Sequence, residues 1–241
     1  MHEKKGVLTM KNYSVLFWDI DDTLLDFQKG EQCAFEAACS TLHIPYSDSF
    51  YNDYHEINEK HWKLLELGKT TREILLVERF KDLFELYHID CDPALMEDTY
   101  RSYLDHQHQF MPYAFDVLQQ LQDMRMCIVT NGRTNTQKKR YHDANLDDFM
   151  ENLYISEQMG LSKPNPEFLY KVMEDMNLTD SSEILLIGDS LSSDILGGNN
   201  AGIDTVWYNP HHKDNNTTAI PTYEIDDLRQ LVNHPHFTLS E

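Results

Sequence analysis

Two hydrophobic patterns alternate along most of the chain. Short apolar runs are typical of strands buried on both faces, and they occur at Tyr13–Trp18, Met126–Thr130, Leu153–Ile155, Ile184–Ile187 and Asp204–Tyr208. Segments with helical character lie between and after these runs, at Asp116–Met124, Thr134–Ala144, Pro166–Met176, Asp194–Ala201 and near Asp226–Val232. Gly202 is expected to end its helix in the left-handed conformation. Strands that alternate with helices predict an α/β fold with a doubly wound parallel sheet.

The long stretch after the first strand has a different pattern. Apolar residues recur there at helical spacing, and the predicted helices are Gln28–Leu42, Phe50–Leu67, Thr71–Leu86 and Pro93–Phe110. The stretch needs no strand, so it has no place in the sheet. We therefore predict an inserted all-helical cap domain at residues 26–110. Residues 1–25 and 111–241 then form the α/β core domain.

The amino-acid composition limits the kinds of molecule that the protein is expected to bind. The 241 residues are 41% hydrophobic and 25% charged, as in an ordinary soluble globular protein. Acidic residues outnumber basic ones by 41 to 20, for a net charge of −21. This balance argues against nucleic acid polymers and anionic membranes as partners, although a small anion needs only a local positive site. We expect a monomer or small homo-oligomer that acts on a small molecule.

Nothing in the sequence suggests export or membrane insertion. The four cysteines form no CxxC pair, which favours reduced thiols and a cytoplasmic setting. No apolar run approaches the roughly 20 residues of a membrane helix. The first residues, MHEKKGVLTMKN, are basic but lack the apolar core of a signal peptide, and Met10 is a second candidate start.

Polar residues gather at the predicted carboxyl ends of the strands, where open parallel sheets bind ligands. The first strand leads into Asp19 and Asp21, with Thr23 beyond. The ends of the later strands supply Thr130, Asn131 and Asp189, and Asp194 follows five residues after Asp189. Asn165 suits a helix N-cap and Pro166 the first helical position, so Lys163 is expected to be held just outside a helix start.

These residue types suit phosphoryl transfer. Several carboxylates in a small space stay ionised only beside a cation, and oxygen ligands without Cys or His favour Mg²⁺. A carboxylate beside a metal can act as a nucleophile, and a second one two residues on can serve as general acid and base. A hydroxyl, backbone N–H groups and one lysine can hold the oxygens of the transferring group.

At this point the sequence resembles the haloacid dehalogenase-like superfamily, in its phosphatase branch with a helical cap. The four motifs occur in order. They are DIDDT at 19–23, the threonine of IVTNG at 130, the lysine of LSKPNP at 163, and GDSLSSD at 188–194. The resemblance covers nearly the whole chain and implies a Rossmann-like core with a cap between motifs one and two. It further implies a Mg²⁺-dependent hydrolase that acts on a small phosphorylated metabolite.

The resemblance also implies roles. Asp19 corresponds to the nucleophile that forms the aspartyl-phosphate, and Asp21 to the general acid/base. Thr130, Asn131 and Lys163 correspond to phosphate binders. The implied Mg²⁺ ligands are Asp19, the backbone carbonyl of Asp21, and Asp189, with Thr23 and Asp194 in support. In the family the cap closes over the site and selects the substrate.

One position departs from the family pattern. Many members have glycine where this chain has Asp22, so we expect its side chain to point away from the metal and to brace the following turn. The stretches DIDDTLLDF and LLIGDSLSSDILGGNNAGIDTVWYN are most similar to the pyrimidine 5′-nucleotidase branch. The leading hypothesis is therefore a 5′-nucleotidase. Gly197 and Gly198 fall inside a predicted helix, where close helix packing is the expected reason for them.

Other functions stay open. A sugar-phosphate phosphatase or phosphomutase of the same fold would carry the same motifs. A signalling receiver domain also combines acidic residues, a threonine and a lysine, but it is about half as long and lacks the second acid. In the cap, His61, Trp62, Lys69 and Arg72 are candidate contacts to the rest of the substrate, although helix surface or cap packing would also explain them.

Overall fold

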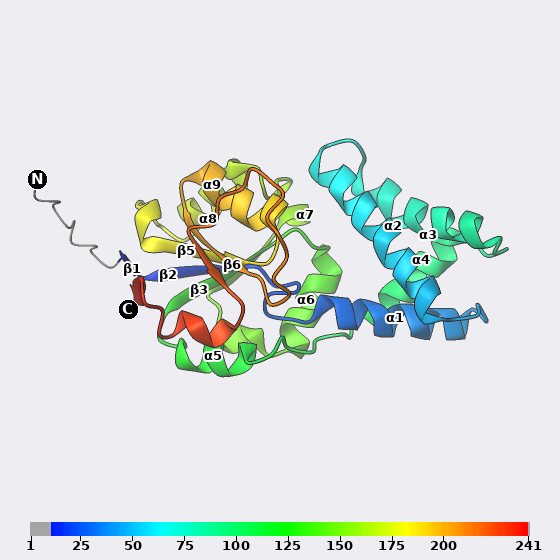
Figure 1. Ribbon diagram of the computed structural model, residues 1–241, viewed down its shortest axis with the longest axis horizontal. Helices are drawn as coiled ribbons and strands as arrows, with labels where there is room; N and C mark the ends of the chain where they lie inside the picture. Colours follow the sequence, from blue (N-terminus) through cyan, green and yellow to red (C-terminus); the bar gives the residue numbers. More distant parts are fainter. Residues whose placement is uncertain (1–10, 241) are drawn as a thin grey trace, which may run out of the picture.

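The computed structural model describes residues 11–240, apart from the side chain of Glu66 (Figure 1). The expectations about a leader and a start at Met10 fall on residues 1–10 and lie outside the described residues. Figure 1 shows a sheet-containing part and a group of helices beside it, joined near the start of α1.

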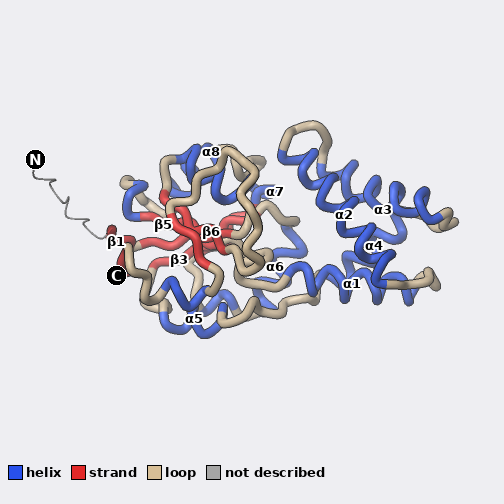
Figure 2. Tube along the Cα trace, viewed as in Figure 1, coloured by secondary structure: helices blue, strands red, loops and turns tan. Residues whose placement is uncertain are grey.

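A parallel sheet lies at the centre of the sheet-containing part (Figure 2). Its strands run in the order β4-β3-β2-β5-β6-β7, and every neighbouring pair is parallel. The strands are β2 (Val15–Trp18), β3 (Arg125–Thr130), β4 (Asn152–Ile155), β5 (Ile184–Gly188), β6 (Asp204–Tyr208) and β7 (Tyr223–Ile225). The predicted doubly wound parallel sheet is confirmed.

Both faces of the sheet are covered. The helices of this part are α5 (Ala114–Gln120), α6 (Thr134–Asp143), α7 (Ser156–Met159), α8 (Pro166–Asp175) and α9 (Leu196–Ala201). Successive side chains of a strand point to opposite faces. Accordingly, Leu16 and Trp18 pack into the cluster that includes α5, while Val15 and Phe17 pack into the cluster that includes α8. This is why β2 is apolar at every position.

The strand order indicates where a ligand-binding crevice is expected at the edge of the sheet. With β2 as the first strand of the fold, the order reverses between β2 and β5, as it does at the ligand-binding crevice of dinucleotide-binding folds. The chain leaves β2 at Asp19 and leaves β5 at Asp189, so these two carboxylates emerge at the point of reversal.

Four helices form the second part of the molecule. They are α1 (Phe27–Thr41), α2 (Asp48–Glu66), α3 (Arg72–Tyr87) and α4 (Pro93–Leu104). They share an aromatic core of their own, in which Tyr54 stacks on Phe35 at 4.4 Å and on Phe80 at 5.1 Å between ring centroids. From this separate packing we propose residues 26–110 as the cap domain and the remainder as the core domain.

One predicted helix ends earlier than expected, and another begins differently. α4 ends at Leu104 and not at Phe110, because the chain there returns to the core. The amide of Met111 donates to the carbonyl of Leu24 at 2.8 Å, and that of Asp26 to Gln109 at 2.8 Å. The helix predicted at Asp194–Ala201 begins with a π-helical turn, Leu191–Ile195, before α9; Gly202 follows with φ of 68°, as predicted.

The chain ends hold elements that the hydrophobic pattern did not predict. β1 (Lys11–Tyr13) pairs in parallel with β8 (Phe237–Leu239), and both are too short to give a strand pattern. The last predicted helix is a 3-10 turn, Leu228–Leu231. Within residues 11–240 no helix is both long and apolar enough to cross a membrane.

Candidate active site

Three carboxylates come together beyond the ends of β2 and β5. Asp19, Asp189 and Asp194 each offer an oxygen, and these oxygens all lie within 4.8 Å of one another. The amide of Asp19 still donates to Ile187 on the neighbouring strand at 2.9 Å, which fixes the backbone just before the chain turns away. Asp194 is buried, and its second oxygen accepts from the amide of Ser190 at 3.1 Å.

Lys163 places its ammonium group within this cluster. Its Nζ donates to Asp19 at 2.7 Å, to Asp194 at 2.6 Å and to the backbone carbonyl of Val129 at 2.5 Å, and only 1% of the residue is exposed. Although burial lowers it, the neighbouring Asp19 and Asp194 raise the pKa of Lys163 above its ordinary value. The lysine is therefore a fixed positive charge.

The loop of Lys163 is held by the side chain of Asn131. Its amide nitrogen donates to the carbonyl of Lys163 at 2.8 Å, and its oxygen accepts from the amide of Lys163 at 3.0 Å. Asn165 caps α8 through the amide of Glu167, as its position before Pro166 predicted. The Asn131 side chain thus positions the lysine.

Negative charge in the cluster is not balanced by the lysine. Burial, opposed by Lys163 and reinforced by Asp194 and Asp21, raises the pKa of Asp19 to about 8. Burial, with Asp194, Asp22 and Asp19 nearby, also raises the pKa of Asp189 well above its ordinary value. Since three acidic groups face one ammonium, their oxygens fit a divalent cation that prefers oxygen ligands, such as Mg²⁺.

Asp21 lies outside the carboxylate cluster. One oxygen of its side chain forms an ion pair with Nη1 of Arg140, and the other accepts from Nε2 of Gln137 at 2.6 Å. The two aspartates of the DIDDT stretch therefore face different partners. This separation allows them to have different roles.

The hydroxyl of Thr130 keeps a donor available. Its Oγ1 accepts from the amide of Gly132 at 3.1 Å and from Gln137 at 2.9 Å, so its hydrogen can still donate to a phosphate oxygen. Thr23 is fully buried, and its Oγ1 has no hydrogen-bond partner among the described residues. Support from Thr23 would therefore come from its packing.

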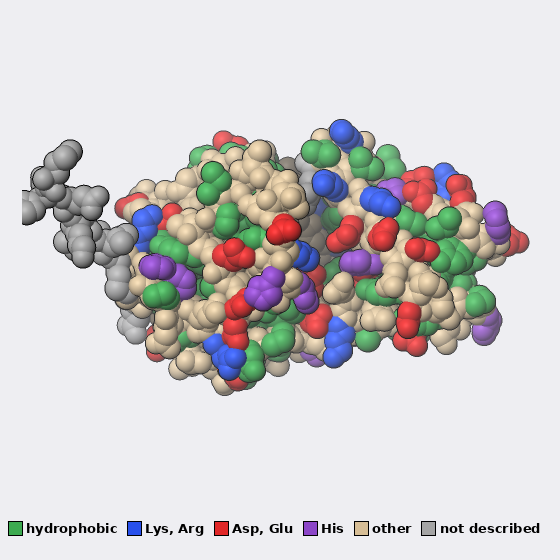
Figure 3. Space-filling view, in the orientation of Figure 1, with side chains coloured by type: hydrophobic (Ala, Val, Ile, Leu, Met, Phe, Trp, Pro, Cys, Tyr) green, Lys and Arg blue, Asp and Glu red, His purple; other side chains and the backbone are tan. Residues whose placement is uncertain are grey.

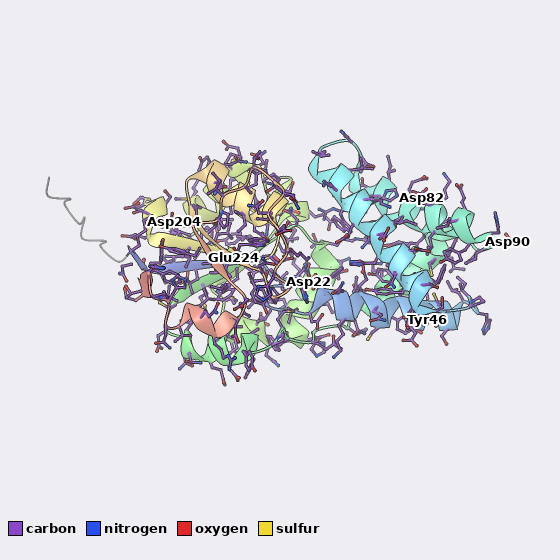
Figure 4. The ribbon with its side chains drawn as sticks, viewed as in Figure 1. Asp22, Tyr46, Asp82, Asp90, Asp204 and Glu224 are labelled. Carbon is purple, nitrogen blue, oxygen red and sulfur yellow. The ribbon has the colours of Figure 1, made fainter. Side chains whose placement is uncertain are left out.

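Asp22 stands at the turn between the sheet and α1 (Figure 4). Its φ is 55°, a conformation that glycine adopts without strain, and its Oδ1 accepts from the amide of Gln28 at 3.0 Å. The side chain braces the start of α1, together with Asp26, which caps the helix through the amide of Lys29.

A cavity of about 560 Å³ lies between the carboxylate cluster and the cap helices. Figure 3 shows a hollow between the two parts of the molecule, with acidic and basic side chains at its edges. The core supplies Asp19, Asp21, Thr130, Asn131, Asp189 and Asp194 to the lining. The cap supplies both apolar and polar groups, which include Phe27, Glu31, His55, Asn58, Trp62, Leu76, Arg79, Glu97 and Tyr100.

Of the four cap candidates, only Trp62 lines this cavity among the described residues. His61 instead pairs with Asp82 on α3 at 2.8 Å, and Lys69 is exposed in the loop between α2 and α3. Arg72 reaches the core and donates to the carbonyls of Asn131 and Gly132 at 2.9 and 2.8 Å. It therefore docks the cap on the loop after β3.

Sequence reasoning predicted helix α6 but missed the site residues that it carries, and it also missed the buried polar groups of the cap. Gln137 and Arg140 lie one turn apart on the helix that follows the IVTNG strand, a spacing that could have placed both on the face toward the strand ends. Glu97 accepts from Arg79 in the cap at 2.6 Å and from Arg133 in the core at 2.9 Å. Besides Arg72, the pair of Glu97 and Arg133 is thus a second contact between cap and core, and no local sequence pattern indicates it.

Known proteins resemble the chain over most of its length. A family model described as haloacid dehalogenase-like hydrolase matches residues 13–202. The HAD-hydrolase YfnB of Bacillus subtilis is 40% identical over 92% of this chain and 95% of its own. Its magnesium-bound crystal structure, which is described as revealing interdomain movement, covers 92% of this chain and 98% of that one with a TM-score of 0.88.

Two further relatives are named as pyrimidine 5′-nucleotidases. PynA of Streptococcus pneumoniae is 36% identical over 91% of this chain and 94% of its own. YjjG of Escherichia coli is 28% identical over 90% of this chain and 95% of its own.

Proposed function

The chain belongs to the haloacid dehalogenase-like hydrolases, and from that membership we propose that it is a Mg²⁺-dependent phosphomonoesterase. It would act through an aspartyl-phosphate at Asp19, with a nucleoside 5′-monophosphate as substrate. The observation that carries the proposal is the separation of the two aspartates. Asp19 sits with Lys163 in the carboxylate cluster, while Asp21 lines the same cavity with other partners.

The first step transfers the phosphoryl group to the protein. An oxygen of the Asp19 carboxylate attacks phosphorus, and the bond from phosphorus to the ester oxygen breaks. The leaving oxygen takes its proton from Asp21, which becomes ionised. The hydroxyl of Thr130 can donate to an oxygen of the transferring group, and the positive charge of Lys163 beside Asp19 stabilises the negative charge of that group.

The second step restores the protein. Ionised Asp21 takes a proton from a water molecule whose oxygen attacks phosphorus, and the bond between phosphorus and Asp19 breaks. Inorganic phosphate leaves, the Asp19 carboxylate is regenerated, and Asp21 again carries its proton.

The cation would be held by the chain's own oxygens. Asp19, Asp189 and the backbone carbonyl of Asp21 are the proposed ligands, and the closeness of Asp194 supports its place beside them. When bound, Mg²⁺ neutralises negative charge where a phosphate meets Asp19. The structure of YfnB bound to magnesium supports this choice of metal.

The nucleotide substrate is supported by the relatives and by the cavity. PynA and YjjG are named as pyrimidine 5′-nucleotidases. On the cap side, the partly exposed Trp62 offers an aromatic surface for a flat ring, and the polar Asn58 and Arg79 are also among the lining residues. With 560 Å³, the cavity falls within the usual range for small-molecule sites.

A substrate panel tests the proposal. Phosphate release is measured with Mg²⁺ for nucleoside 5′-monophosphates and for sugar phosphates, using wild type and Asp19→Asn. We expect the highest kcat/KM on a nucleoside monophosphate and no release by Asp19→Asn. Equal rates in the two proteins would refute the mechanism, and a clear preference for sugar phosphates would refute the substrate. A phosphoenzyme that persists for minutes would favour a signalling receiver.

A further inference from the structure

We propose that Arg140 is a positioning residue that fixes the carboxylate of Asp21 and ties its place to the linker by which the cap returns to the core. The inference rests on the proposed function, in which Asp21 is the acid/base. It concerns three residues that sequence reasoning did not single out, namely Gly30, Gln107 and Arg140.

Helix α6 holds both oxygens of Asp21. Nη1 of Arg140 forms an ion pair with Oδ1, and Nε2 of Gln137 donates to Oδ2 at 2.6 Å. The same Nη1 also lies 3.1 Å from Oε1 of Gln137, so the two α6 side chains support each other. With its two oxygens held from one helix, the carboxylate cannot turn without moving Arg140 or Gln137.

The same guanidinium reaches the cap linkers. Nε of Arg140 donates to the backbone carbonyl of Gln107 at 2.6 Å, in the segment that leads from α4 back to the core. Its Cζ lies 5.4 Å from the ring centroid of Phe27, the first residue of α1. Only 1% of Arg140 is exposed, so this position between the outgoing and returning chain is fully packed.

The place of the return linker depends on a close approach to α1. A Cβ added at Gly30 would lie 2.8 Å from Cβ of Gln107, which is closer than real Cβ contacts. Because the clash involves the first atom of the Gln107 side chain, rotation of that side chain cannot relieve it. The backbone of α1 or of the linker must move, and a shift of the linker moves the carbonyl that Arg140 binds.

A shift of the linker therefore changes the position of Arg140 relative to the carboxylate of Asp21. Gln107 and Asp21 are bound by two nitrogens of one rigid planar group, so Arg140 cannot follow one partner and keep the other unchanged. Lysine keeps the charge but offers a single nitrogen on a shorter reach. It cannot bridge the two partners in the same geometry.

The test compares two leaving groups. A nucleoside 5′-monophosphate releases an alkoxide that needs a proton, whereas p-nitrophenyl phosphate releases an anion that is stable without one. We measure kcat/KM with Mg²⁺ for both, because this constant includes only steps up to departure of the leaving group. The benchmark is Asp21→Asn, which removes the acid itself.

Two variants probe the link and a third controls for it. Arg140→Lys and Gly30→Ala should each lower kcat/KM for the nucleotide by about 10- to 100-fold and change that for p-nitrophenyl phosphate by less than about 3-fold, since general acid catalysis contributes 10² or more. Lys139→Met removes the contact of 3.0 Å between α6 and His106 of the same linker without touching Asp21. It should leave the ratio of the two constants unchanged.

The outcomes separate the inference from the proposed function. If Asp21→Asn lowers the two constants equally, the acid role of Asp21 fails. If Asp21→Asn separates them but Arg140→Lys lowers both equally, Arg140 is only structural and the inference is overturned. If Gly30→Ala, checked as folded by its melting temperature, keeps the wild-type ratio, the link to the cap linker is overturned.

Discussion

At the scale of single residues, Asp22 occupies a backbone conformation that decides what can replace it. With φ of 55°, a residue with a Cβ pays about 1–2 kcal/mol that glycine does not. Asp22 offsets part of this cost by accepting the amide of Gln28 at the start of α1. Its proposed role is thus confined to the turn.

Substitutions at Asp22 should separate backbone strain from chemistry. We expect Asp22→Gly to keep phosphatase activity within about 3-fold, because Asp19, Asp21 and Lys163 keep their contacts. Asp22→Ala loses the same hydrogen bond but keeps the strain, so it should be less stable than Asp22→Gly by about 1 kcal/mol. Urea unfolding and steady-state kinetics measure the two effects. Equal stability of the two variants would contradict the assigned strain.

The residue scale also shows what the sequence could predict about the site. Asp19, Thr130, Lys163 and Asp189 stand at strand ends or helix starts, so local pattern places them at the same edge of the sheet. Arg140 comes from the interior of a helix and meets Asp21 across 119 positions of sequence. Only the docking of α6 on the sheet brings them together, and no local pattern encodes that.

At the scale of elements, α9 illustrates close packing against the sheet. A Cβ on Gly198 would lie 2.2 Å from Cγ2 of Thr205 on β6 and 3.2 Å from the carbonyl of Ile203. A Cβ on Gly197 would lie no closer than 3.5 Å to its neighbours, an ordinary contact. The expected reason for the glycine pair, close helix packing, therefore applies to one glycine only.

The two glycines give a matched pair of variants. Gly198→Ala should lower the free energy of unfolding by about 1–3 kcal/mol, because overpacking outweighs the gain in helix propensity. Gly197→Ala should have the gain in helix propensity without the overpacking. Its free energy of unfolding should therefore rise by up to about 1 kcal/mol. Chemical unfolding of both proteins checks the difference. Losses of equal size would show that the packing against β6 is not the cause.

The contact between α1 and α2 should depend on pH. Nδ1 of His55 lies 2.7 Å from the buried Glu31, and this hydrogen bond raises the pKa of His55 above its ordinary 6.5. The protonated form is favoured in the folded state, so its contribution is fully present below the unfolded pKa. It is lost as pH rises from about 6.5 through the raised folded pKa.

A glutamine at position 55 can donate to Glu31 without titrating. The free energy of unfolding of wild type relative to His55→Gln should therefore fall as pH rises across that interval, by at most about 1 kcal/mol for a partly exposed pair. Thermal unfolding of both proteins from pH 6 to 9 measures it. A difference that is constant, or that grows with pH, would contradict the assigned direction.

Element types were predictable, but their ends often were not. Mostly apolar runs identified β2, β3, β5 and β6, because strands buried on both faces have few polar positions. Helical spacing continued past Leu104, yet α4 stops there because residues 109–111 pair with the segment around Leu24. That stop is tertiary, and the pattern could not show it.

At the scale of the whole molecule, the acidic cluster stores unfavourable charge that a cation would relieve. Burial and neighbouring carboxylates raise the pKa values of Asp19 and Asp189 in the folded protein. A ligand that binds only the folded state stabilises it by mass action. Cation binding should therefore register as stability as well as activity.

Melting temperatures test this expectation. Mg²⁺ should raise the melting temperature of wild type, and chelation should reverse the rise. Asp189→Asn removes one partly buried charge from the cluster, so it should melt at a higher temperature than wild type without metal and respond little to Mg²⁺. An unchanged Mg²⁺ response in this variant would show that Asp189 does not hold the cation.

The whole-molecule arrangement also links the cap to the loop after β3 at two points. Arg72 of the cap binds the carbonyls of Asn131 and Gly132, and Arg133 of the core binds Glu97 of the cap. The sequence predicted an inserted helical cap and gave Arg72 as a candidate substrate contact, with helix surface or cap packing as the alternative. It could not show that the arginine faces backbone carbonyls, since their position depends on how the two parts dock.

The most direct test of the central claim is detection of the phosphoryl group on Asp19 itself. Wild type is mixed with a nucleoside monophosphate and Mg²⁺, quenched in acid within one turnover, and digested for mass spectrometry. The account predicts one added phosphoryl group on the peptide that contains Asp19, and neither this label nor turnover in Asp19→Asn. Turnover in wild type with no label on that peptide, or continued turnover in Asp19→Asn, would contradict it.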